Sequence, residues 1–127
     1  MKTRYLIDGN NVVGSRPDGW WRDRPGAMRR LIGELDAWAR DAGVDALVVF
    51  DGRPISFPQS GDGVEVAFAT RSGPDAADDD IVRIAPQDAD PARLVVVSSD
   101  AALVARVRAA GTRIESAGTF RRRLDAT

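Results

Sequence analysis

The chain has 127 residues, of which 43% are hydrophobic, and its 18 basic residues nearly balance 19 acidic ones. This length and composition fit one folded unit with a buried core, so we expect residues 1–127 to form a single domain. The sequence contains no cysteine and no histidine, and Lys2 is the only lysine. These absences exclude disulfides, thiolate zinc sites and every nucleophile system that depends on imidazole. The remaining chemistry must use carboxylates, hydroxyls, amides, arginine or a bound metal.

The first ten residues, MKTRYLIDGN, lack the apolar stretch and cleavage site of a secretory signal. No segment approaches the roughly 20 apolar residues that a membrane helix requires. We therefore expect a soluble, cytoplasmic protein with no membrane partner. The sequence does not predict an oligomeric state.

Apolar runs alternate with helical patterns along the chain, which is typical of an α/β fold. The first run, Tyr5 to Ile7, predicts a strand, and the segment from Gly9 to Arg24 has the composition of a loop. Between Pro25 and Gly43 apolar residues recur at spacings of three and four, which predicts a helix with proline in its first turn and glycine at its end. This helix is expected to bury Met28, Leu31, Ile32, Leu35, Trp38 and Ala39.

The alternation continues through the second half of the chain. Ala46 to Phe50 predicts a second strand, Gly52 to Gly63 a loop, and Val64 to Ala69 a third strand whose alternating pattern suits a sheet edge. The remaining expected elements are a helix from Asp78 to Pro86 that buries Ile81, Ile84 and Ala85, a strand from Leu94 to Val97, a helix from Ala101 to Ala110 that buries Leu103, Val104 and Val107, and a weak fifth strand from Arg113 to Glu115. Continuously apolar strands such as Leu94 to Val97 indicate burial on both faces. We predict a three-layer, Rossmann-like fold with a mainly parallel sheet of four to five strands between helices.

Three of the predicted strands end in an aspartate, namely Asp8, Asp51 and Asp100. Parallel strands bring their carboxyl ends to one edge, where open α/β sheets bind ligands, so we expect these side chains to converge. A further acidic group, Asp78 to Asp80, opens the predicted second helix and is a candidate for the same site. Clustered carboxylates repel one another, and Mg²⁺ or Mn²⁺ would offset that repulsion. Water held by such an ion can hydrolyse a phosphodiester without histidine.

Each of these residues also has a purely structural interpretation. Asp8 and Asp51 precede glycine and suit turns. Asp78 to Asp80 would stabilise a helix N-terminus, and one of residues 98 to 100 would cap the third helix. One common site explains all four groups together, whereas separate structural roles require a coincidence.

Three segments resemble, in order and spacing, the NYN domain of the PIN-like nuclease superfamily: Tyr5 to Val12, Ala77 to Val82 and Val96 to Asp100. The similarity covers nearly the whole chain and is to the small bacterial YacP-like ribonucleases in particular. It implies a PIN-like fold and a Mg²⁺- or Mn²⁺-dependent endoribonuclease that acts on mRNA, tRNA or ribosome-associated RNA. The resemblance assigns metal binding to Asp8, Asp78, Asp79 and Asp100 and a supporting catalytic role to Asn11; Asp51 and Ser99 are further candidates, and Asp80 lies outside the site.

RNA contacts are expected from the predicted first loop. Trp20 and Trp21, with Arg22 and Arg24 beside them, would stack an unpaired base and hold phosphate. In the alternative interpretation, one tryptophan closes the core and the other packs on the helix from Pro25. Arg121 to Arg123 form either an RNA-facing patch or the solvated side of a terminal helix.

Other functions compete with this interpretation. Phospho-acceptor domains also place aspartates at strand ends, but they need a lysine near the phosphate, and Lys2 is badly placed to supply it. A nucleotide-binding domain is not indicated, because the sequence has no Walker-type glycine-rich loop with its lysine. The main alternative is a non-catalytic RNA- or protein-binding module with the same fold, and a PIN-type toxin is another. Metal binding distinguishes the first of these from a nuclease.

Overall fold

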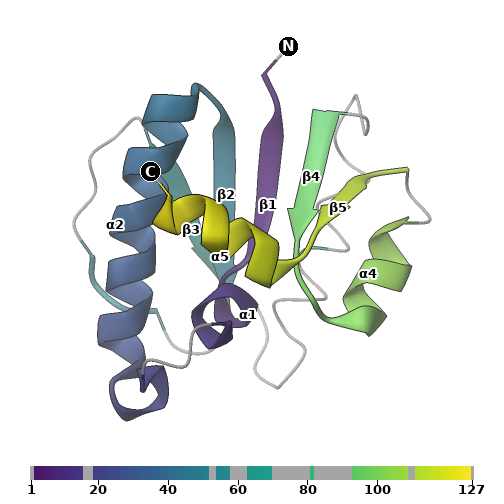
Figure 1. Ribbon diagram of the computed structural model, residues 1–127. Helices are drawn as coiled ribbons and strands as arrows, with labels where there is room; N and C mark the ends of the chain where they lie inside the picture. Colours follow the sequence, from purple (N-terminus) through teal and green to yellow (C-terminus); the bar gives the residue numbers. More distant parts are fainter. Residues whose placement is uncertain are drawn as a thin grey trace.

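The computed structural model describes residues 2–15, 19–51, 54–57, 63–69, 81, 93–108 and 111–126. It confirms the predicted α/β fold, because five parallel strands form one sheet in the order β3-β2-β1-β4-β5 with helices packed against it (Figure 1). The strands are β1 (Arg4–Asp8), β2 (Asp45–Phe50), β3 (Val64–Phe68), β4 (Leu94–Val97) and β5 (Arg113–Glu115). The helical elements are α1 (Gly9–Gly14), the 3-10 turn η1 (Trp20–Arg22), α2 (Arg24–Ala42), α4 (Ala101–Arg108) and α5 (Ala117–Asp125).

The apolar strands divide their side chains between two cores, one on each face of the sheet. Tyr5 and Ile7 of β1 join the larger core, which is shared with α1, α2 and α5. Leu6 points to the smaller core on the other face, with Leu103 of α4. Both faces are therefore buried, which explains why the central strands show no alternation of apolar and polar residues.

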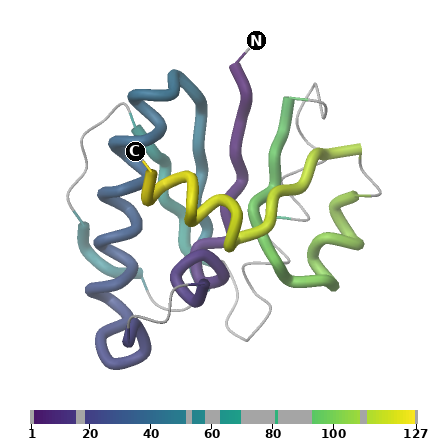
Figure 2. The backbone as a smooth tube through the Cα atoms, in the orientation of Figure 1, coloured from purple at the N-terminus to yellow at the C-terminus, as the bar shows by residue number. Residues whose placement is uncertain are grey.

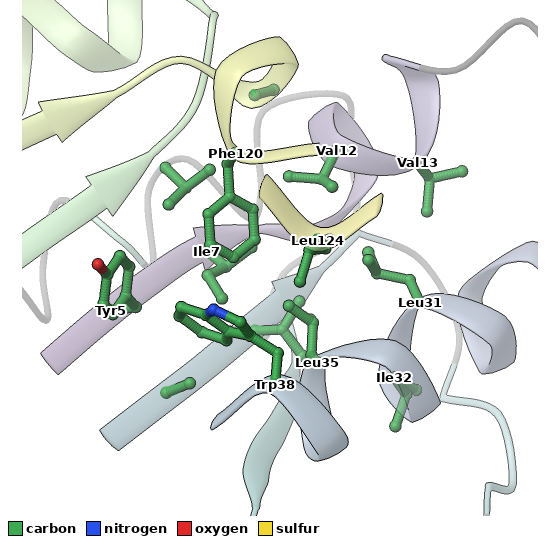
Figure 3. Packing of buried hydrophobic residues seen from close by; sticks show 14 of the residues in the cluster. Tyr5, Ile7, Val12, Val13, Leu31, Ile32, Leu35, Trp38, Phe120 and Leu124 are labelled. Carbon is green, nitrogen blue, oxygen red and sulfur yellow. The ribbon is translucent and has the colours of Figure 1, made fainter. Parts of the chain in front are cut away.

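Helix α2 begins and ends within one residue of its predicted bounds. The Asp23 side chain caps it by accepting a hydrogen bond from the Gly26 amide (3.0 Å), and Gly43 ends it in the left-handed conformation at φ 66°. All six side chains expected to be buried are buried. Trp38 packs edge-on against Tyr5 and Phe120, with ring centroids 4.8 and 5.0 Å apart (Figure 3).

The prediction of a loop from Gly9 to Arg24 is wrong for much of that segment. Helix α1 follows β1 directly, and η1 precedes α2. Asp8 caps α1, while Val12 and Val13 are buried against the larger core. A β-carbon at Gly9 would collide with the Phe50 ring, so this turn requires glycine.

The smaller core and the sheet edges agree largely with the predictions. Ile81 is helical and fully buried, but the rest of the expected helix from Asp78 to Pro86 lies outside the described residues. In α4, Leu103 is buried as predicted, whereas Val104 is only partly buried. Strand β3 lies at the edge of the sheet, as its alternating pattern indicated. Within the described ranges, no helix has the length and apolar character needed to cross a bilayer.

The backbone trace shows which elements meet at the carboxyl ends of the strands (Figure 2). Helix α1 lies at the end of β1, and α4 begins at the same end of the sheet, after β4 (Figures 1 and 2). Helix α5 crosses one face of the sheet beside α2 (Figure 1). The predicted site residues after β1, β2 and β4 therefore lie at this one edge.

Candidate active site

The site lies at the centre of the sheet, where the chain order of the strands reverses. Strands β2, β1 and β4 are neighbours; Asp8 is the last residue of β1, Asp51 follows β2, and Asp100 follows β4. Later strands are added on the other side of β1, so β1 and β4 form the topological switch point of the sheet. Open α/β sheets bind their ligands outside the carboxyl ends of the strands at such a point.

Ser98 joins Asp8 and Asp100 across this switch point. Because Ile7 pairs with Val97 in the parallel register, the next residues of the two strands lie side by side. The Ser98 hydroxyl donates to Asp8 Oδ2 (3.0 Å) and accepts from the Asp100 amide (3.1 Å). Ser98 is only 1% exposed and Asp8 only 4%. The sequence interpretation considered Ser98 only as a helix cap, although its place directly after a buried strand was a usable signal.

Both aspartates also cap helices, as the structural interpretation of the sequence expected for Asp100. Asp100 Oδ1 accepts from the amides of Ala102 (2.9 Å) and Leu103 (3.1 Å) at the start of α4. Asp8 Oδ1 accepts from the Asn11 amide (3.4 Å) at the start of α1. A carboxylate accepts several bonds, and among the described residues nothing hydrogen-bonds to Asp100 Oδ2. Capping therefore does not exclude binding of a cation.

Two asparagines of α1 hold the turns that follow β2 and β4. Asn11 Oδ1 accepts from the Ser99 amide (2.7 Å), and Asn10 Oδ1 accepts from the Asp51 amide (2.6 Å). Ser99 Oγ in turn accepts from the Ala117 amide (2.8 Å) at the start of α5. The structure thus brings Asn11, Ser99 and Asp51 to the same edge as Asp8. Asn10 was not predicted as a site residue, because its partner lies 41 residues away in the sequence.

Asp8 has an electrostatic environment that disfavours its charge. The pKa of Asp8 is raised from its ordinary value of 3.8 to about 6, mainly by burial, and the nearby carboxylates of Asp51 and Asp100 act in the same direction. The hydrogen bonds from Ser98 and Asn11 act in the opposite direction but do not offset the burial. A cation beside Asp8 would reverse this balance by favouring the charged carboxylate.

The donors at this edge fit part of the shell of a hard divalent cation. They are carboxylate, amide and hydroxyl oxygens, which Mg²⁺ and Mn²⁺ prefer. Within the described part of the chain, no group of three acidic side chains is close enough to hold a metal ion. The other two predicted ligands, Asp78 and Asp79, lie outside the described residues.

The tryptophans before α2 differ from each other in exposure. Trp20 is partly buried and packs against the larger core, with the guanidinium of Arg24 6.0 Å from its ring centre. Trp21 meets Trp20 edge-on at 6.0 Å and is 57% exposed. The alternative interpretation is therefore right that one tryptophan packs against the core, whereas the packing of Trp21 on α2 stays a prediction. Arg22 lies in η1 and is exposed.

The three arginines near the end of the chain do not form one solvated face. Arg121 is only 7% exposed and lies 3.3 Å from Glu34. Arg123 forms an ion pair with Glu115 (2.7 Å) and donates to the Tyr5 hydroxyl (3.0 Å). Of these three arginines, only Arg122 is exposed and has no acidic partner among the described residues. The expectation of a solvated arginine is thus wrong for Arg121, which faces the core side of α5.

Comparison with known proteins adds a family and a fold. The family model for the YacP-like NYN domain matches residues 5–127. A crystal structure of a mutant form of Rae1 (YacP) from Bacillus subtilis has a TM-score of 0.81 and 23% sequence identity, and the alignment covers 99% of this chain and 76% of that chain. A second crystal structure of Rae1 (YacP) from Bacillus subtilis has a TM-score of 0.76 and 23% identity, with coverage of 96% and 73%. No curated protein matches the sequence.

Proposed function

Because the chain belongs to the family of YacP-like NYN domains, a nuclease-type family, we propose that it is a Mg²⁺- or Mn²⁺-dependent endoribonuclease. The observation that carries the proposal is the buried Asp8 carboxylate, which lies at the switch point of the sheet near Asp51 and Asp100. Burying a carboxylate beside two others is costly without a positive charge. A site that binds a cation gives this arrangement a purpose. The 127 residues would act as one domain on cytoplasmic RNA.

Each residue of the site has a role in this proposal. Asp8 and Asp100 hold the metal ion, together with Asp78 and Asp79. A bound Mg²⁺ or Mn²⁺ would activate water and stabilise the negative charge that develops on the phosphate. Ser98 orients both Asp8 and Asp100 through its two hydrogen bonds. Asn11 fixes the turn after β4, so that Asp100 keeps its position relative to Asp8.

The surface before α2 supplies a candidate contact for the RNA. Trp21 is exposed and stands on the partly buried Trp20, which limits its freedom to move. An exposed indole stacks on any unpaired base, and the neighbouring Arg22 and Arg24 supply positive charge for phosphate. We therefore assign Trp20, Trp21, Arg22 and Arg24 to RNA binding.

The test is cleavage of labelled single-stranded and structured RNA in Mg²⁺, Mn²⁺ or EDTA. We expect cleavage only with metal, and a loss of more than about 100-fold in Asp8→Asn and Asp100→Asn, because changes outside the ligand shell already cost about 10- to 100-fold. Asp45→Asn is the matched control, since Asp45 lies at the opposite end of β2 and its side chain is 51% exposed. The control should cleave at the wild-type rate.

Two results together would overturn the proposal. RNA that stays intact with every metal, and calorimetry that detects no Mg²⁺ or Mn²⁺ binding, would leave the aspartates as helix caps. The chain would then be a non-catalytic binding module with the same fold.

A further inference from the structure

An open groove borders the aspartates on the side of α1. Its volume is about 400 Å³, which lies within the range of small-ligand sites. One wall consists of Asn10, Asn11, Gly14 and Ser15, and the other of Ser99 and the first two residues of α5. Asn11 and Ser99 also belong to the hydrogen-bond network of the site. Asn11 Oδ1 accepts from the backbone amide of Ser99, and the backbone amide of Asn11 donates to Asp8. The groove therefore shares Asn11 and Ser99 with the hydrogen-bond network of Asp8, although no aspartate of the described residues lines it.

The hydrogen bonds at the groove leave mainly donors to face a ligand. The side-chain oxygens of Asn10 and Asn11 each accept a bond from a backbone amide, which sets the orientation of both carboxamides. Their Nδ2 groups have no partner among the described residues and are thus available as donors. Ser99 Oγ accepts from a backbone amide and keeps its own hydrogen for donation. Ser15 Oγ donates to the Val12 carbonyl and can accept.

Among the described residues, the side chains that line the groove are amides, hydroxyls and small groups, and none of them is ionisable. The guanidinium of Arg122 lies beside this lining, 3.8 Å from where a β-carbon of Gly118 would be. Phosphate groups in proteins are usually held by arginine or lysine, whereas amides and hydroxyls recognise neutral groups such as a ribose hydroxyl or the edge of a base. The small residues Gly14 and Gly118 keep the walls low, so a flat ring can enter. Gly14 also lies against Trp20, since a β-carbon there would be 3.8 Å from the indole. The wall formed by Gly14 therefore lies next to Trp20.

We propose that this groove binds one nucleoside of single-stranded RNA, next to the phosphodiester that is cut at the aspartates. The inference rests on the proposed function and adds the place where the strand leaves the site. The donors of Asn10, Asn11 and Ser99 bind acceptor atoms of the base and ribose, and the next nucleotide reaches Trp21. A base paired within a duplex cannot enter, so the groove selects unpaired RNA.

The test fills the groove without disturbing the fold. A β-carbon at Gly118 would meet only the end of the flexible Arg122 side chain, at 3.8 Å, and Gly118 has an ordinary helical φ. Gly118→Ala narrows the groove and Gly118→Leu fills it. Gly33→Leu is the matched control, because Gly33 lies on the exposed side of α2 with nothing within 4 Å of a β-carbon. Thermal unfolding of all variants verifies that they fold.

The readout is binding of a short fluorescein-labelled single-stranded RNA in EDTA, measured by anisotropy, with cleavage in Mg²⁺ measured in parallel. We expect Gly118→Leu to weaken binding about tenfold or more, the size of one lost base contact, with Gly118→Ala in between and Gly33→Leu unchanged. A single abasic nucleotide, moved along the RNA, should weaken binding to wild type at one position and have no such effect in Gly118→Leu.

The two proposals fail in different ways. If Gly118→Leu binds RNA as tightly as wild type, or wild type binds no RNA, the groove inference is wrong, whatever the cleavage assay shows. If RNA binds and the binding depends on Gly118, but no metal supports cleavage, the groove inference holds and the nuclease proposal falls.

Discussion

Partly or fully buried carboxylates occupy two different environments in this molecule. On the α5 side of the sheet, Glu34 lies 3.3 Å from Arg121 and Glu115 lies 2.7 Å from Arg123. At the carboxyl edge, Asp8 meets a hydroxyl and a backbone amide, and the charges that act on it come from other aspartates. No arginine of the described ranges forms an ion pair with Asp8. Arginines of α5 thus provide positive charge for Glu34 and Glu115, whereas none of the described residues provides it for Asp8.

This difference separates residues that serve the fold from residues that serve a ligand. A paired carboxylate compensates for its own burial, and both pairs fix α5 against the rest of the structure. The negative charge of Asp8 instead opposes the metal-free fold, because burial and the neighbouring carboxylates disfavour it, although the same side chain caps α1. Such a cost is expected where a positive ligand binds. Substitutions of Arg121, Arg122, Asp8 and Ser98 test this contrast.

The largest effect on stability is expected from Arg121→Ala. The substitution removes the guanidinium that lies 3.3 Å from Glu34, and it removes the apolar packing of the arginine stem. Breaking a fully buried pair costs about 3–5 kcal/mol; because the Glu34 side chain is 29% exposed, we expect a loss of about 2–3 kcal/mol. Urea unfolding measures this difference.

Arg122→Ala is the control for that substitution. Arg122 is the next residue of α5, but it is exposed, and within the described part of the chain it donates only to Thr119. Its loss should change stability by less than about 0.5 kcal/mol. Equal effects at the two positions would mean that the contrast between buried and exposed arginines does not govern stability.

In contrast to Arg121→Ala, Asp8→Asn is expected to increase the stability of the metal-free protein. The pKa of Asp8 is about 6 in the fold and 3.8 without it, so the folded state binds its proton more tightly and wild type loses stability as pH rises from about 4 to 6. The shift corresponds to at most about 3 kcal/mol, and we expect asparagine to recover about 1–2 kcal/mol above pH 6 and almost nothing near pH 4. Thermal unfolding in EDTA at these two pH values measures the gain.

Added Mg²⁺ or Mn²⁺ sharpens this prediction. A cation that binds the folded wild type raises its stability, whereas the variant lacks the carboxylate and gains little. A variant that is less stable than wild type at high pH without metal would show that Asp8 supports the fold rather than a ligand.

The features that sequence reasoning predicted correctly are those that depend on local patterns. The six buried residues of α2 repeat at helical spacing, and strands such as Leu94–Val97 are apolar throughout, so their burial and the α/β class follow from the sequence. Helix α1 was missed because its six residues, GNNVVG, are too short for a helical period and are poor helix formers. Capping by Asp8 and packing of Val12 and Val13 hold it in place. Tertiary contacts, rather than propensity, determine this element.

The site shows the same division. Asp8, Asp51 and Asp100 were found because each follows an apolar run, which is a local signal; their role as metal ligands stays a prediction. The contribution of Ser98 depends on the register of β1 against β4, which no local pattern contains. Burial of Arg121 was predictable in part, since Ala117, Phe120 and Leu124 place it on the apolar face of α5. The pairing of Arg121 with Glu34 was not predictable, because Glu34 lies 87 residues away in the sequence.

The smallest effect on stability is expected from Ser98→Ala. This substitution tests the hydrogen bonds through which Ser98 joins Asp8 and Asp100. The substitution removes the hydroxyl that donates to Asp8 and accepts from the Asp100 amide, at a cost of about 1 kcal/mol. In the Asp8→Asn background the Ser98 hydroxyl donates to a neutral group, so Ser98→Ala should reduce stability by less. A double-mutant cycle should therefore give a coupling free energy of about 0.5 kcal/mol. Ser98 is buried between β1 and β4. Additive effects of the two substitutions would contradict a direct hydrogen bond to Asp8, and Ser98 would then stabilise the fold only through the Asp100 amide. A measurable coupling would instead mean that Ser98 stabilises the charged carboxylate, and that its loss raises the pKa of Asp8 further.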